Sequence, residues 1–101
     1  MGTGTSSASD AKAKASKAIS AGTFKVTRKE NHVAMTSEMK VKGVGSVLVR
    51  QLPQTVGGGF LYRIDVTDKN GYTYPPLMTA EPDMEAAQKR ARAMMKRDLK
   101  L

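Results

Sequence analysis

The stretch from Phe60 to Pro76 constrains the fold of this chain more than any other part of its sequence. From Phe60 to Val66, apolar residues occupy every second position, the pattern of a strand with one buried face. Asp68-Lys69-Asn70-Gly71 follows, and Asn-Gly favours the positive φ angles of tight hairpin turns. Tyr72-Thr73-Tyr74 begins a return strand, which we expect to stop at Pro75-Pro76 because proline cannot donate to a ladder. The sequence therefore predicts an antiparallel hairpin.

The C-terminal stretch has the pattern of an amphipathic helix. Pro82 fits the first turn, acidic residues surround it, and basic residues gather at the other end, so the charges match the helix dipole. Basic residues also lie opposite the apolar stripe, which gives the predicted helix a basic outer face. The stripe recurs at steps of three and four and consists of Met84, Ala87, Ala91, Met94 and Met95.

Three further stretches have strand-like sequence. Residues 24–28 alternate between apolar and polar, residues 33–41 suggest a second strand or an irregular hairpin arm, and residues 46–52 are β-rich and closed by Pro53. The three glycines at 57–59 predict a flexible loop. Together these elements predict an α+β fold. We expect a small antiparallel sheet of three to four strands with one C-terminal amphipathic helix packed on it.

The N-terminal stretch differs in composition from the rest of the chain. Residues 1–22 are almost entirely Gly, Ser, Thr, Ala and Lys, without an apolar stripe that could dock on a core. We therefore expect a disordered arm at 1–22 and a single α+β domain at 23–101. Residues 11–18 resemble the Lys/Ala-rich tails of linker histones and other chromatin-type proteins. Because Ala and Lys are good helix formers, we expect either an arm that becomes helical on an anionic surface or a plain disordered leader.

The order of elements from Phe60 to Leu101 also resembles a known architecture. A strand, an Asn-Gly hairpin, a second strand and a helix follow one another, as in the small three-stranded-sheet-plus-helix domains of the integrase-arm and plant AP2 type. In those families the sheet face enters the major groove of DNA. The resemblance implies DNA contacts by Arg50, Arg63 and Lys69 here.

The charge balance is strongly basic, with 17 Lys and Arg against nine Asp and Glu and a formal net charge of +8. An excess of this size raises encounter rates with anionic partners, so we expect nucleic acid, DNA ahead of RNA, contacted at its phosphates. The positive charge concentrates in the arm, the first strands and the outer face of the helix. The candidate nucleic-acid-binding residues are Lys25, Arg28, Lys29, Lys40, Lys42, Arg50, Arg63, Lys89, Arg92 and Lys96.

No pattern in the sequence predicts an enzyme. The chain has no cysteine, and its single histidine, His32, lacks the partners of a zinc site or a catalytic triad. Neither glycine cluster, 43–45 or 57–59, leads into a helix as a phosphate loop would. We therefore expect no cofactor, no metal and no small-molecule substrate. Tyr62, Tyr72 and Tyr74 could stack on bases if exposed, although burial is the expected fate of Tyr62.

The remaining expectations concern location and an alternative function. The chain lacks an apolar signal segment and a membrane-spanning stretch, so we expect a cytoplasmic protein without a membrane partner. The alternative to nucleic-acid binding is a non-enzymatic protein-interaction module, such as a viral or mobile-element accessory or assembly protein. Its partner would be another protein or a second copy of the chain, docked at a sheet edge or an exposed apolar patch.

Overall fold

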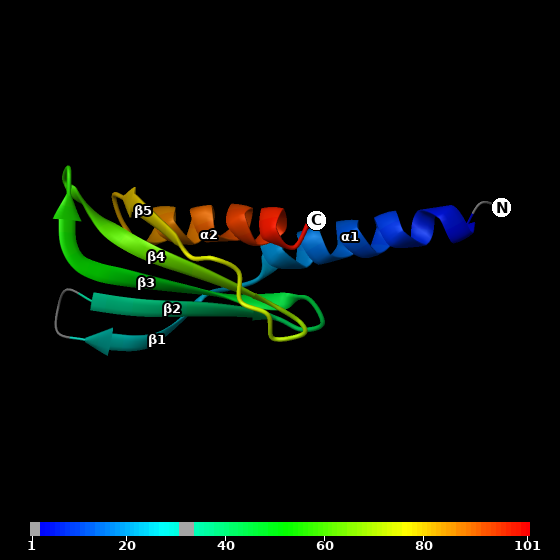
Figure 1. The fold of residues 1–101 in the computed structure, drawn as a ribbon, viewed down its shortest axis with the longest axis horizontal. Coiled ribbons are helices and arrows are strands. Elements are labelled where there is room, and N and C mark those ends of the chain that lie inside the picture. Colours follow the sequence, from blue (N-terminus) through cyan, green and yellow to red (C-terminus); the bar gives the residue numbers. More distant parts are fainter. Residues whose placement is uncertain (1–2, 31–33) are drawn as a thin grey trace.

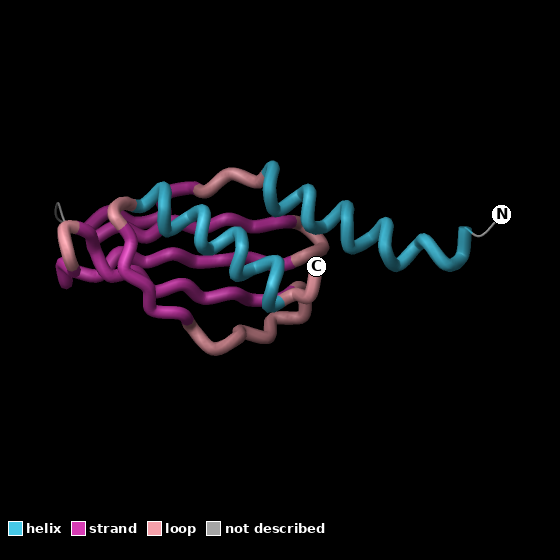
Figure 2. Tube along the Cα trace, turned by 90° about the horizontal axis from the view of Figure 1, so that it is seen from above, coloured by secondary structure: helices cyan, strands magenta, loops and turns pink. Residues whose placement is uncertain are grey.

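The fold is a five-stranded antiparallel sheet with a helix on one face and a second helix at one end (Figures 1 and 2). The computed structural model describes the backbone of residues 3–30 and 34–101 and the side chains of residues 10–26 and 35–101. The strands pair in chain order, β1-β2-β3-β4-β5. The elements are α1 (Thr3–Ala21), β1 (Lys25–Glu30), β2 (Ala34–Val41), β3 (Gly45–Val56), β4 (Gly59–Asp68), β5 (Leu77–Glu81) and α2 (Met84–Asp98).

The predicted class is confirmed: the chain is α+β, with an antiparallel sheet and a C-terminal helix packed on it. The predicted count of three to four strands is wrong, because the sheet has five. It also departs from the three-stranded sheets of the integrase-arm and AP2 type.

The fifth strand follows the prolines that were expected to end the sheet. Tyr72 to Tyr74 contribute only one isolated bridge, Thr67↔Thr73. After Pro75-Pro76 the chain rejoins β4 and pairs with it from Ile64↔Leu77 to Phe60↔Glu81. The Asn-Gly turn is present, with Gly71 at a φ of 90°. The prolines therefore interrupt the pairing with β4 without ending it.

The hairpin that joins β3 and β4 differs from the prediction in two respects. Gly57 and Gly58 have φ angles of 55° and 85°, and Val56 pairs with Gly59 across them. The expected flexible loop is therefore a tight two-residue turn. Pro53 was expected to close the strand, but β3 continues to Val56. The register between β3 and β4 shifts between Gln51 and Thr55, and a bulge of this kind accommodates a residue that cannot donate a ladder hydrogen bond.

The core lies between the sheet and α2, as the helical stripe predicts. Asp83 caps the helix, since its Oδ1 accepts a hydrogen bond of 2.9 Å from the backbone N–H of Ala86. The buried helix residues Ala87, Ala91, Met94 and Met95 belong to one cluster with the buried sheet residues. Those sheet residues are Met39, Val47, Val49, Tyr62, Ile64 and Val66.

Helix α1 occupies the stretch for which the sequence predicts a disordered arm. Alanine and lysine are strong helix formers, and Ile19 anchors the last turn because its side chain is fully buried in the core cluster. The rest of α1 projects past the end of the sheet (Figure 2). The division of the chain into an arm at 1–22 and a domain at 23–101 stays a prediction.

Candidate nucleic-acid interface

The two faces of the sheet differ, because α2 covers only one of them (Figures 1 and 2). We call the other one the helix-free face. Residues that pair directly across antiparallel strands share a face. Pairing therefore groups the side chains of the helix-free face into rows that cross the strands.

One of these rows, which we call the arginine row, carries two exposed arginines side by side. Its described members are Thr36, Arg50, Arg63 and Met78, which are joined by direct pairing across β2 to β5. Arg28 takes the neighbouring position in β1, since its backbone pairs with Thr36. Two of the ten predicted binding residues, Arg50 and Arg63, therefore lie in one row, and the backbone of a third, Arg28, pairs with the row at Thr36.

Arg50 and Arg63 are directly opposite on neighbouring strands, and both are exposed. Side chains in this relation have Cβ atoms about 5 Å apart, and like charges there destabilise a sheet by roughly 0.2–1 kcal/mol. The Nε of Arg63 lies 3.2 Å from Oδ2 of Asp65, along the same strand. Among the described residues, no carboxylate lies within ion-pair distance of Arg50. Within the described residues, the charge of Arg50 in this row thus has no carboxylate partner.

A second row on this face combines a lysine with hydroxyl groups, and we call it the lysine–hydroxyl row. It consists of Lys40, Ser46, Thr67 and Thr73, again joined by direct pairing. The hydroxyl oxygens of Thr67 and Thr73 are 3.0 Å apart. Lysine and hydroxyl side chains are common partners of phosphate oxygens.

A mixed row separates the arginine row from the lysine–hydroxyl row. It contains Lys25 at the β1 edge, then Glu38, Leu48 and Asp65. The two carboxylates in this row repel phosphate. The basic and hydroxyl side chains of the arginine row and the lysine–hydroxyl row therefore form two separate tracks on the helix-free face.

The cations of α2 are largely engaged by the protein itself. The Nη2 of Arg92 donates to the carbonyl oxygen of Gly22 at 2.9 Å, and its guanidinium lies 5.1 Å from the ring centre of Phe24. Lys96 donates to the hydroxyl of Ser20 at 2.6 Å. These two predicted binding residues thus connect α2 to the end of α1 and the segment before β1.

Other helix arginines have acidic neighbours. Arg90 pairs with Glu81 and Arg97 with Asp98, both at 3.5 Å. Of the predicted residues on α2, Lys89 is exposed, whereas Arg92 and Lys96 are half-buried. The outer face of α2 therefore offers less unpaired charge than the helix-free face.

The remaining predicted residues do not join either track. Lys42 is exposed in the turn between β2 and β3, and Lys69, which the AP2 resemblance implicates, is exposed in the turn after β4. The backbone of Lys29 pairs with that of Met35. The side chains of Arg28 and Lys29 lie outside the described residues.

All five aromatic side chains of the chain lie away from the helix-free face. Phe24 packs under Arg92, and Tyr62 is fully buried with Phe60 at its edge, as expected for Tyr62. Thr73 faces Thr67, so its neighbours Tyr72 and Tyr74 point to the opposite side, where their rings meet edge to face. Within the part of the chain whose side chains are described, the arginine row therefore has no aromatic ring beside it.

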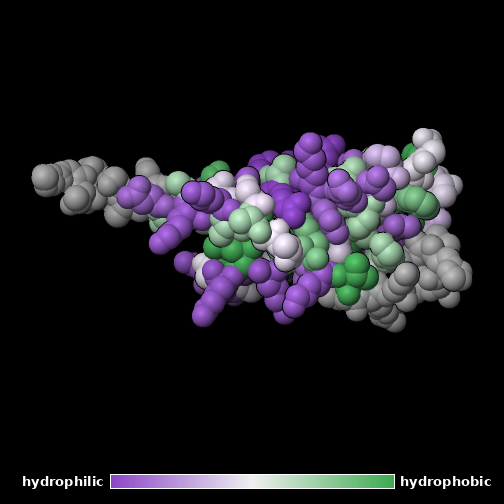
Figure 3. Space-filling model, turned by 180° about the vertical axis from the view of Figure 1, so that it is seen from behind, coloured by the Kyte–Doolittle hydropathy of each residue, from purple (hydrophilic) through white to green (hydrophobic). Residues whose placement is uncertain are grey.

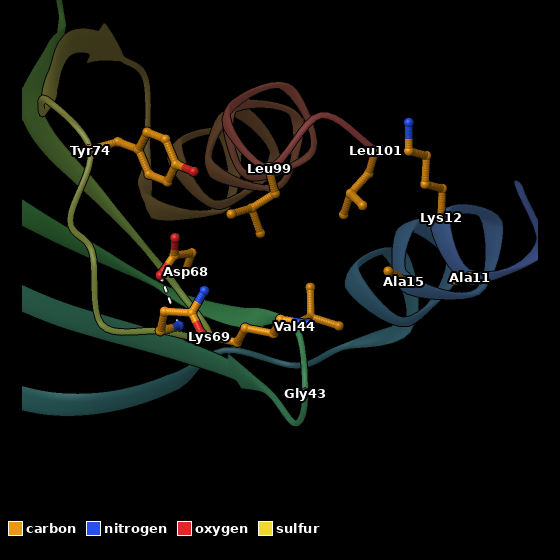
Figure 4. A pocket seen from close by; sticks show the side chains of 11 residues that line it. Ala11, Lys12, Ala15, Gly43, Val44, Asp68, Lys69, Tyr74, Leu99 and Leu101 are labelled. Carbon is orange, nitrogen blue, oxygen red and sulfur yellow. Dashed lines mark hydrogen bonds between the residues drawn. The ribbon is translucent and has the colours of Figure 1, made fainter. Parts of the chain in front are cut away.

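A hollow of about 330 Å³ lies where α1, the β2–β3 turn and the C-terminus meet (Figure 4). Val44, Leu99 and Leu101 supply its apolar wall, whereas Lys69 and Asp68 bring opposite charges to its rim. Desolvation, together with the carboxylates of Asp68 and Asp98, raises the pKa of Tyr74 above its ordinary value. These groups do not converge on a reacting position.

Exposed apolar side chains are scattered. On the side of the molecule seen in Figure 3, hydrophilic side chains predominate and hydrophobic ones lie between them. The large exposed ones, Val26, Val56, Tyr72 and Met78, belong to β1, the tip of β3, the β4–β5 connection and β5. They do not form one apolar patch.

Within the described part of the chain, no three His, Asp or Glu side chains are grouped so that they could hold a metal ion. None of the helices described here is both long and apolar enough to cross a membrane. No family model, curated protein or solved structure matches this chain.

Proposed function

We propose that this protein binds nucleic acid through the helix-free face of its sheet, with DNA as the first partner to test. The observation that carries the proposal is the direct opposition of Arg50 and Arg63 in a row that also contains position 28. A phosphate beside the row relieves their repulsion, and guanidinium groups bind phosphate through paired hydrogen bonds.

The side chains of the helix-free face favour a polyanion, with many negative charges along its length, over a single small anion. Arg50, Lys40 and the hydroxyls of Ser46 and Thr73 are spread over several strands. An extended polyanion can contact all of them at once, whereas a small anion can contact only one or two. The net charge of +8 adds long-range attraction to such a partner.

The alternative of a protein-interaction module has less support. It calls for an open sheet edge or a continuous apolar patch, and the exposed apolar residues here are dispersed over separate elements. The edge strand β1 carries Lys25 and a register shift after Val26, and such features discourage strand addition.

The test is the salt dependence of DNA binding, measured by fluorescence anisotropy with the full chain and Arg50→Gln. Affinity for a short DNA duplex should fall steeply as salt rises, because each phosphate contact contributes about −0.9 to the logarithmic slope. Arg50→Gln should make the slope shallower by about that amount.

Lys89→Gln is the matched control, since Lys89 is exposed on α2, on the other side of the sheet. It removes the same charge from the chain and should leave the slope nearly unchanged. Affinity that does not respond to salt would overturn the proposal. If Arg50→Gln and Lys89→Gln weaken the affinity for DNA equally, binding depends on the net charge of the chain rather than on the helix-free face.

A further inference from the structure

We infer that the partner of the helix-free face is double-stranded rather than single-stranded DNA, an inference that rests on the proposed function. Two features lead to it: the aromatic side chains point away from this face, and its phosphate-binding groups form two separate tracks.

The first feature disfavours single strands. Proteins that bind single-stranded nucleic acid combine basic grooves with aromatic rings on which bases stack, worth roughly 1–3 kcal/mol per base. Here Tyr62 is buried, and Tyr72 is exposed on the opposite side from Thr73. Among the described side chains, a splayed base above Arg50 therefore meets aliphatic and charged groups but no aromatic ring.

The second feature favours a duplex. On β3, Arg50 belongs to the arginine row and Ser46 to the lysine–hydroxyl row. The two residues are four positions apart, so at the rise of an antiparallel strand the two rows are separated by about 13 Å. Along β4 the same spacing separates Arg63 from Thr67. The major groove of B-form DNA is about 12 Å wide between its two backbones. Each track can thus contact one strand.

The mixed row between the tracks fits this arrangement. Glu38 and Asp65 would repel a phosphate placed over the middle of the face. A duplex with a groove facing the sheet places its backbones over the two tracks and leaves the middle free of phosphate. A lone strand has one line of phosphates and can use only one track at a time.

The experiment compares a short duplex of mixed sequence with each of its single strands at the same salt concentration, using the full chain, Arg50→Gln and Lys40→Gln. These variants each remove a cation from one track. A single strand cannot stack its bases on an aromatic ring among the described side chains of this face, and one such stacked base is worth about tenfold in affinity or more. We therefore expect the full chain to bind the duplex at least about tenfold more tightly than either single strand. Each variant should also make the duplex salt slope shallower by about 0.9.

Three results separate the possible failures. If the full chain binds neither probe, the proposed function fails. If it binds single strands as tightly as the duplex, the duplex inference fails although nucleic-acid binding stands. If Arg50→Gln alters the duplex slope and Lys40→Gln behaves like Lys89→Gln, only one track binds, and the inference fails in the same way.

Discussion

The two faces of the sheet are built from alternate residues of the same strands, yet they follow different rules. On the helix-covered face, Val49 and Ile64 pair across the strands, and both are fully buried. One residue further along, Arg50 pairs with Arg63, and both are exposed. The first pair stabilises the fold by apolar burial, whereas the second places like charges side by side.

Packing accounts for the residues of one face of the sheet but not for those of the other. Packing against α2 explains the buried apolar residues of the covered face, because each contributes apolar area to one core. Packing does not explain the arginine row, nor the exposed charge of Arg50, which lacks a carboxylate partner among the described side chains. A residue choice that opposes local stability is characteristic of a functional surface. The contrast can be tested by changing each face separately.

The largest expected effect is on the covered face. Ile64→Ala removes a fully buried side chain between the sheet and α2, and should lower the free energy of unfolding by about 2–5 kcal/mol. Leu48→Ala, on the helix-free face, should lower it by less than about 1 kcal/mol, since Leu48 is only half-buried. Urea denaturation measures both. If Ile64→Ala does not fold, Ile64→Val should still lose about 0.5–1.5 kcal/mol. Similar decreases in the free energy of unfolding for Leu48→Ala and Ile64→Ala would mean that the two faces are equally buried.

An effect of intermediate size concerns Tyr62, whose buried hydroxyl donates to Oε1 of Gln51 at 3.2 Å. Desolvation, aided by Asp83 and Glu81, raises the pKa of this tyrosine above its ordinary value of 10.0. Folding therefore favours the protonated phenol. That stability is complete below about pH 10 and is lost as the pH rises through the folded-state pKa.

Denaturation at increasing pH, followed by tyrosine absorbance, measures this effect. Tyr62→Phe should flatten the alkaline decline and reduce stability at neutral pH by about 1 kcal/mol through the lost hydrogen bond. Tyr72→Phe is the control, because Tyr72 is exposed. If the free energy of unfolding of Tyr62→Phe still declines to the same extent at alkaline pH, groups other than Tyr62 cause the decline.

The smallest expected effect has the opposite sign. Arg50→Glu replaces a like-charge pair with an opposite-charge pair against Arg63, and should raise the free energy of unfolding by roughly 0.2–1 kcal/mol. The same change should abolish phosphate contact at this position. A variant that is more stable and binds DNA more weakly would establish that the row serves binding. A less stable variant would show that Arg50 has a structural role.

The elements with strong local patterns could be predicted from the sequence. The alternation from Phe60 to Val66 and the stripe on α2 both identified the buried residues, because one buried face imposes its period on the chain. Strand ends were harder, since prolines near β3 and β5 were interpreted as stops. Pairing with β4 on either side of them supplies the hydrogen bonds that keep both strands in the sheet.

The candidate site could be predicted only as a set of residue types. Charge and alternation pointed to Arg50 and Arg63, but one sequence contains no direct signal for their pairing across β3 and β4. By their positions in the helical repeat, Arg92 and Lys96 cannot be distinguished from cations that face solvent. Their engagement with Gly22 and Ser20 depends on where α1 ends in space, and no local pattern predicts that.

The bulge at Pro53 determines which charges meet on the helix-free face. The pairs Thr55↔Phe60 and Val56↔Gly59, continued without the bulge, would bring Arg50 opposite Asp65. The bulge takes up two residues of β3, so that Arg50 faces Arg63 instead, with every side chain still on its original face. Straightening the bulge with all residues of β3 retained would therefore convert a repulsive pair into an attractive one, without changing any residue of the proposed binding surface. The charge that this face presents to an anion thus depends on the register of β3 as well as on the composition of the face.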